Sequence, residues 1–163
     1  MSFRRIASLF VVAACGWMAL AAQAQVPQYG PNVTYDQARK ALAGAIADAK
    51  RQNLPMAVAV VDTAGQLVAF ERMDGADLVT IGLAQDKAWT ALMNRMPTRD
   101  LAPLVQPGAE FYGYESIGRG RTIVFAGGMP LLRDGVLAGG VGVSGGSVEE
   151  DQAAVDAAVA AFA

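Results

Sequence analysis

The stretch MAVAVVDTAGQLVAFER, residues 56–72, decides the fold class because it holds two strand patterns separated by a turn. Met56 to Val61 is a continuous, valine-rich apolar run, which is typical of a buried strand. Asp62 to Gly65 supplies turn residues, and Leu67 to Arg72 has the pattern of a second strand. The stretch therefore predicts an antiparallel hairpin.

Helical patterns lie on both sides of this hairpin. Thr34 and Gln37 form a capping box before an apolar stripe that Pro55 ends. After the hairpin, residues 78–95 place apolar side chains on one face, and Thr98 can cap a short helix through Leu104. A second capping box, Ser147 with Glu150, opens the last helix.

The second half of the chain adds strands to the hairpin. Residues 122–126 are predicted to be a strand that Gly127 and Gly128 bend, and residues 129–132 pair through an Asp134-Gly135 turn with residues 136–143. The order of elements predicts one α+β domain over residues 34–163, with a largely antiparallel five-stranded sheet flanked by helices. Residues 25–33 are a short N-terminal extension.

Composition excludes several classes of function. The chain has 163 residues, of which 53% are hydrophobic, and a net charge of -2, so it has no basic field that would hold nucleic acid. Histidine is absent, which excludes Ser-His-Asp catalysis and removes the commonest zinc ligand.

The N-terminus has the pattern of a cleaved secretory signal peptide over residues 1–24. Arg4 and Arg5 precede an apolar run, and Ala22 to Ala24 supplies the small residues of a cleavage site. Two alternatives stay open: a retained anchor, and a lipobox in which Cys15 is acylated. In each case we expect export to the periplasm or beyond. Cleavage after Ala24 would leave a domain with no cysteine and no membrane contact.

The least regular stretch is AEFYGYESIGRGR, residues 109–121, which predicts a long exposed loop. Loops of this length in compact domains are usually functional or mobile. Tyr112 and Tyr114 can either embrace a flat ligand or anchor the loop against the domain.

Glycines precede the last helix in the pattern G-x-G-x-x-G at Gly140, Gly142 and Gly145. A dinucleotide fold is excluded because no second parallel strand follows that helix. The glycines can instead let a helix or a bound group approach the sheet closely. The segment from Ser144 through Gly145 to Ser147 is expected to offer free backbone N–H groups to a carboxylate or phosphate.

Charged residues give candidate roles with two interpretations each. Arg72, Arg119 and Arg121 can clamp a ligand carboxylate or be solvated surface residues. Asp86 and Lys87 adjoin on one helix and point in different directions. Lys87 is either an exposed helical lysine or a buried lysine with a lowered pKa that acts as a base with Asp86.

An ordered set of motifs resembles the GlcG/HbpS family over nearly the whole mature domain. The motifs are residues 57–65 (AVAVVDTAG), residues 72–76 (RMDGA), Lys87-Ala88, Pro97-Thr98, residues 125–130 (FAGGMP), Gly135, residues 140–145 (GVGVSG) and Asp151. The resemblance implies a central antiparallel sheet in a profilin-like layering, and assembly into homo-oligomers. It also implies haem binding, because secreted members of the family bind haem, whereas a related domain is fused to corrinoid adenosyltransferases.

The chain departs from that family at the iron ligand, which in relatives is a histidine or a side chain of the loop before the FAGG strand. Here that loop carries Phe111, Tyr112 and Tyr114, so the resemblance implies a tyrosine phenolate as the replacement ligand. Met129 or Met73 is the next candidate for that ligand. The acidic iron ligands of a haem-sensing relative would fall on residues 83–86, where only Asp86 is acidic. No separate metal site is predicted.

Three hypotheses about function follow. The first is an exported haem- or tetrapyrrole-binding protein whose propionate groups meet Arg72, Arg119 or the start of the last helix. The second is a small periplasmic enzyme that acts on an organic acid or aromatic compound through Lys87 or Asp86. The third is a ligand-free oligomeric partner-binding protein.

Overall fold

The computed structural model describes residues 26–163, so the predicted signal peptide and Cys15 lie outside the described residues. The helices are α1 (Tyr35–Gln52), α2 (Leu78–Asn94), α3 (Thr98–Leu101) and α4 (Val148–Phe162), and the strands are β1 (Ala57–Asp62), β2 (Leu67–Arg72), β3 (Gly128–Arg133) and β4 (Val136–Ser144). Two short 3-10 helices, η1 (Ala102–Val105) and η2 (Tyr114–Ser116), follow α3. The predicted α+β class is confirmed.

The sheet has four strands in the order β2-β1-β4-β3, and every neighbouring pair is antiparallel. The expected hairpins are β1–β2 and β3–β4, and their inner strands β1 and β4 pair with each other. Residues Gln28 and Gly30 hydrogen bond to Leu137, so the N-terminal extension continues the sheet beside β4 where β1 has ended.

The predicted fifth strand over residues 122–126 is wrong. Ile123 donates its backbone N–H to the Thr90 hydroxyl on α2 at 3.0 Å, and the Thr122 hydroxyl donates to the Ile117 carbonyl oxygen at 2.8 Å. This segment therefore satisfies its polar groups on α2 and within its own loop. Pairing with β4 begins only at Gly128, after Gly127 has adopted a φ of 106°.

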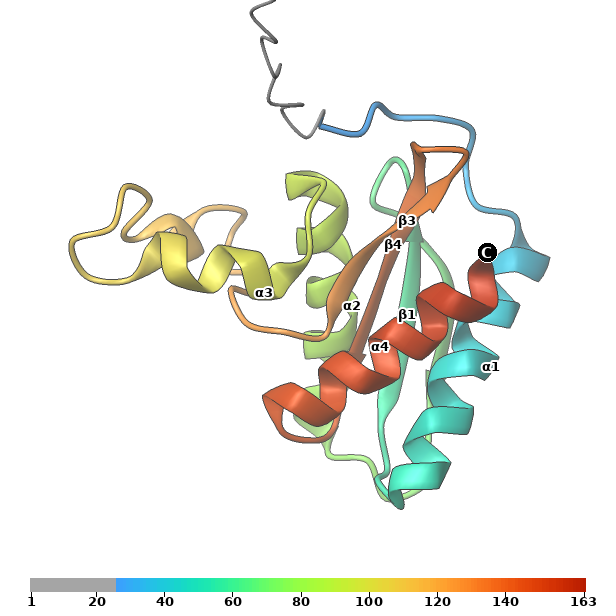
Figure 1. Ribbon diagram of the computed structural model, residues 1–163. Coiled ribbons are helices and arrows are strands. Elements are labelled where there is room, and N and C mark those ends of the chain that lie inside the picture. Colours follow the sequence, from blue (N-terminus) through green and yellow to red (C-terminus); the bar gives the residue numbers. More distant parts are fainter. Residues whose placement is uncertain (1–25) are drawn as a thin grey trace, which may run out of the picture.

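Both faces of the sheet are covered, which explains the continuous apolar run of β1. Val58 and Val60 pack with α1 and α4 on one face, while Ala57 and Ala59 pack with α2 on the other. Figure 1 shows α1 and α4 side by side on one side of the sheet, α2 on the other, and α3 with its following loop projecting away. Among residues 26–163, no helix has the length and hydropathy needed to cross a membrane.

The helix ends agree with the predicted capping boxes. Thr34 and Gln37 exchange side chain to backbone hydrogen bonds at the start of α1, and Ser147 and Glu150 do so at the start of α4. Each box satisfies N–H groups that the first helical turn leaves without partners.

Glycines of β4 let α2 lie directly on the sheet. A methyl group on Gly140 would overlap the Ala88 carbonyl oxygen, and one on Gly142 would overlap the Ala84 carbonyl oxygen. The expectation that these glycines permit close approach of a helix is therefore confirmed.

We expect Gly142→Ala to lower the free energy of unfolding by about 1–3 kcal/mol, because α2 must move away from β4 to admit the methyl group. Gly82→Ala is the matched control, since Gly82 lies on the exposed side of α2 with no atom within 4 Å of the added carbon. That control should be neutral or stabilising by up to about 1 kcal/mol through helix propensity. Urea denaturation checks both variants, and equal losses in the two would contradict the packing argument.

Candidate functional site

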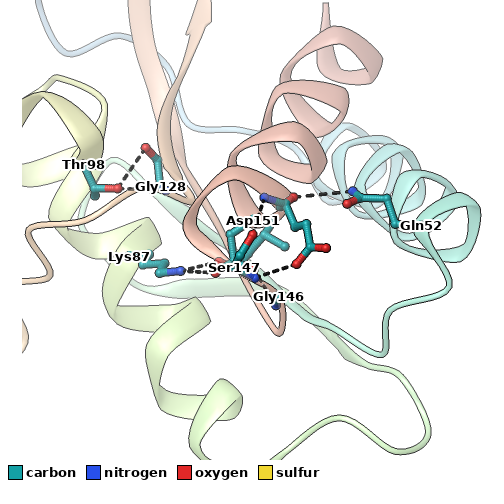
Figure 2. A network of polar contacts seen from close by, with 9 residues as sticks. Gln52, Lys87, Thr98, Gly128, Gly146, Ser147 and Asp151 are labelled. Carbon is teal, nitrogen blue, oxygen red and sulfur yellow. Dashed lines mark hydrogen bonds and ion pairs between the residues drawn. The ribbon is translucent and has the colours of Figure 1, made fainter.

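Lys87 reaches from α2 to the first turn of α4, and its side chain is fully buried. Its Nζ donates to Asp151 Oδ2 at 2.5 Å and to the Val143 carbonyl oxygen at 3.0 Å (Figure 2). Asp151 is buried as well, and its Oδ1 accepts a hydrogen bond from Gly146 N–H at 2.9 Å. A buried ion pair is stable only when such additional hydrogen bonds satisfy it. The pair therefore fixes α2 against the β4–α4 junction.

The surroundings of Lys87 hold its nitrogen away from solvent. Burial lowers the pKa of Lys87 below its ordinary value of 10.5, while attraction and hydrogen bonding to Asp151 oppose that shift. The Phe125 ring lies 5.0 Å from Nζ, which is a cation–π distance. Of the two interpretations of Lys87, burial is confirmed, but a nitrogen with no exposed surface offers a substrate no access. The geometry supports a structural role.

Asp86 belongs to a different cluster from its neighbour Lys87. Its Oδ1 accepts a hydrogen bond from Arg121 Nε at 2.8 Å, and the Arg121 guanidinium lies 4.9 Å from the Trp89 ring centre. The expectation that Asp86 and Lys87 point in different directions is thus confirmed. Arg121 thus attaches the end of the aromatic loop to α2 through Nε, while its side chain stays 42% exposed.

The start of α4 does not offer the free N–H groups that the sequence predicts beside Ser144 and Gly145. Gly146 N–H donates to Asp151, and Ser147 N–H donates to Glu150 Oε2 at 2.7 Å. Ser144 itself is buried. The prediction of free N–H groups is therefore wrong at Gly146 and Ser147, because carboxylates of the helix accept hydrogen bonds from both (Figure 2).

The aromatic loop, residues 109–121, carries exposed apolar side chains beside α2. Phe111, Tyr112 and Ile117 are 46%, 66% and 57% exposed, respectively. Together with Tyr114 and Ser116 they line an open hollow of about 260 Å³. The Tyr114 hydroxyl donates to Asn94 Oδ1 at 2.6 Å, whereas the Tyr112 hydroxyl has no hydrogen bond within residues 26–163. The anchoring interpretation is confirmed for Tyr114, whereas Tyr112 faces solvent.

The remaining candidate residues are spread over the fold. Arg119 is exposed within the loop, but Arg72 lies at the end of β2 beside Lys50 and Asp74. Met129 and Met73 pack with α1 and α4, on the face of the sheet opposite α2. These two methionines, which are the next candidates for an iron ligand after the tyrosines, therefore lie across the sheet from α2, to which the loop is attached.

Comparison with known families identifies proteins of the same architecture. A family model described as haem degrading protein HbpS-like matches residues 33–160. The chain belongs to this HbpS-like family. The resemblance predicted from the motifs is confirmed.

Members and relatives of the family differ in what their names describe. The chain is 44% identical over 118 residues to the corrinoid adenosyltransferase PduO of Salmonella typhimurium, covering 72% of this chain and 35% of PduO. It is therefore similar to about a third of that relative's length. A solved structure of a PduOC:Heme complex is 40% identical, with a TM-score of 0.77, and the match covers 80% of this chain and 94% of that one. The Klebsiella pneumoniae protein ORFY is 31% identical, with a TM-score of 0.80 over 86% of this chain and 97% of that one.

Several residues that matter in the structure had no assigned role in the sequence. Asp151 appeared only as one motif residue, although it pairs with Lys87 over a separation of 64 residues. Thr98 similarly appeared as a helix cap, but its hydroxyl accepts a hydrogen bond from Gly128 N–H at 2.9 Å at the start of β3 (Figure 2). The FAGG, Pro-Thr and Asp151 motifs are thus neighbours in space, which their spacing along the chain does not indicate.

Lys87→Met should lower the free energy of unfolding by about 3–5 kcal/mol near neutral pH, because it leaves Asp151 buried without its cation. The folded chain holds Lys87 with a lowered pKa, so unfolding takes up a proton between that pKa and 10.5. The stability contributed by Lys87 therefore increases as the pH rises through this window. We expect the difference in free energy of unfolding between the native chain and Lys87→Met to widen as the pH rises toward 10.5.

Urea denaturation at a series of pH values measures this difference. Lys40→Met, at an exposed position of α1, is the control, and its effect should stay within about 0.5 kcal/mol. A difference that narrows with rising pH would show that the pKa of Lys87 is raised.

Proposed function

We propose that the mature chain binds haem or a related tetrapyrrole on its aromatic loop. The observation that carries the proposal is the exposure of Phe111, Tyr112 and Ile117 around one open hollow. Exposed apolar side chains gathered in this way are typical of a binding surface. The family description and the relative solved as a heme complex support the same ligand class.

The residues of the loop fit the chemistry of haem. Tyr112 has a free phenol oxygen, and tyrosine is an established axial ligand of haem iron. Its neighbours Phe111 and Ile117 offer apolar surface to a flat macrocycle, and the exposed guanidinium of Arg119 can pair with a propionate. Bound haem would supply an iron centre able to take one more ligand or exchange an electron.

The enzyme alternative receives no support from the geometry of Lys87 and Asp86. Lys87 is fully buried in its ion pair, and Asp86 is bound to Arg121. Within residues 26–163 there is also no group of three acidic, histidine or cysteine side chains arranged to hold a metal ion. We therefore propose that the primary function of the chain is to bind a tetrapyrrole and that the chain does so as a homo-oligomer.

Titration of the purified mature chain with ferric haem should give a saturable, stoichiometric shift of the Soret band. Tyr112→Phe should remove the charge-transfer absorption of an iron–phenolate bond and weaken binding about tenfold or more, because the iron loses its ligand. Tyr114→Phe is the matched control, since its hydroxyl already donates to Asn94, and it should leave the spectrum unchanged.

The outcomes separate the parts of the proposal. The same spectrum in both variants would exclude Tyr112 as ligand, and a spectrum lost only in Tyr114→Phe would reverse the assignment. Absence of any saturable shift in the native chain would overturn haem binding itself. Light scattering with and without haem would measure self-association in the same samples.

We also propose that the chain is exported and cleaved before Gln25, on the basis of Arg4, Arg5 and the Ala22–Ala24 site. Expressed in a Gram-negative host, the full chain should yield a periplasmic product whose N-terminus is Gln25. Ala24→Pro should block this cleavage, whereas Cys15→Ser should not alter the product mass. A product that begins at an acylated Cys15 would instead show lipoprotein processing.

A further inference from the structure

A second cavity lies behind the aromatic loop, between the loop and the projecting α3–η1 segment seen in Figure 1. Its volume is about 350 Å³, which is near the lower end of the range for small-molecule sites. The apolar walls come from Met96, Leu101, Leu104, Val105 and Phe111. Leu101 and Val105 are buried, so they give the cavity a fixed floor.

The polar groups of this cavity are Asn94 and Tyr114, which are bonded to each other at 2.6 Å. Asn94 Nδ2 donates one hydrogen to the Thr90 carbonyl oxygen at 2.9 Å, and its second hydrogen has no partner within residues 26–163. The Tyr114 oxygen, which donates its own hydrogen, keeps a lone pair that can accept. Together these two lining side chains therefore retain one donor and one acceptor, which is the pair that a hydroxyl group can satisfy.

No charged side chain lines the cavity. A carboxylate or phosphate placed there would lose its hydration without gaining a cation, at a large cost in free energy. This excludes the charged propionates of haem, and the volume is too small for a whole macrocycle. The surface hollow at Tyr112 and this cavity therefore call for different ligands.

We infer that this cavity binds a small, neutral aromatic molecule that carries one hydroxyl group. One molecule with two fused rings fits the volume, and the apolar walls cover its carbon surface. Asn94 and Tyr114 provide hydrogen-bond partners for its hydroxyl group. The inference goes beyond the proposed function and does not depend on it. The two sites nevertheless share Phe111 and Tyr114 as a common wall.

The probe for this site is 2-naphthol, with binding measured by calorimetry on the haem-free mature chain. We expect saturable binding at one site per chain. Naphthalene, which lacks the hydroxyl, should bind about threefold to tenfold more weakly, because Asn94 and Tyr114 then lose one partner. 2-Naphthoate should bind at least tenfold more weakly, because its carboxylate meets no cation.

Two variants test the location. Leu104→Trp should fill the cavity and abolish binding, whereas Leu132→Trp, on β3 outside the cavity, should not affect it. Tyr114→Phe should reduce 2-naphthol affinity about threefold to tenfold and leave naphthalene affinity unchanged. Circular dichroism would verify that each variant retains its fold.

Each contrary result overturns the inference. Binding that survives Leu104→Trp would place the probe elsewhere, and naphthoate affinity equal to that of naphthol would contradict an uncharged site. No saturable binding in the native chain would contradict the site altogether. Tyr112→Phe separates this site from the haem proposal, because it should alter the haem spectrum and leave 2-naphthol binding unchanged.

Discussion

The close approach of α2 to β4 is the constraint on which the rest of the structure depends. Small residues on the α2 side of the sheet, Ala57 and Ala59 in β1 and Gly140 and Gly142 in β4, remove side-chain volume between helix and strands. Only at that separation does the Lys87 side chain reach both the Val143 carbonyl oxygen and Asp151. Packing and the buried ion pair therefore stabilise each other, and the aromatic loop is attached to the helix that they hold in place.

The sequence predicts those parts of the fold whose causes are local. Capping boxes, turn residues and the apolar run of β1 each act within a few residues, and the structure confirms them. The predicted strand over residues 122–126 fails because its partner is the Thr90 hydroxyl on α2, which no local pattern indicates. Long-range contacts of single polar side chains are what the sequence leaves undetermined.

In the candidate site, too, local features are predictable from the sequence and long-range contacts are not. Exposure of the aromatic loop follows from its composition, but the different roles of Tyr112 and Tyr114 do not, since Asn94 lies 20 residues from its tyrosine partner. Likewise, free N–H groups at the start of α4 are a sound expectation from a helix N-terminus in general. Here Asp151 and Glu150 lie where their carboxylates accept those hydrogen bonds, so the general rule does not hold.

Several of the motifs that carry the family resemblance meet in the core, at Lys87, Gly127, Gly128 and Asp151, where they join α2, β3, β4 and α4. They therefore describe how the domain is held together, and a fold so defined can present different loops to different ligands. The ligand chemistry that we propose lies instead in residues 94–121, where polar and aromatic side chains line the two cavities. A chain without histidine can remain in this family because its core needs none, while its loop offers phenol oxygens in two distinct settings.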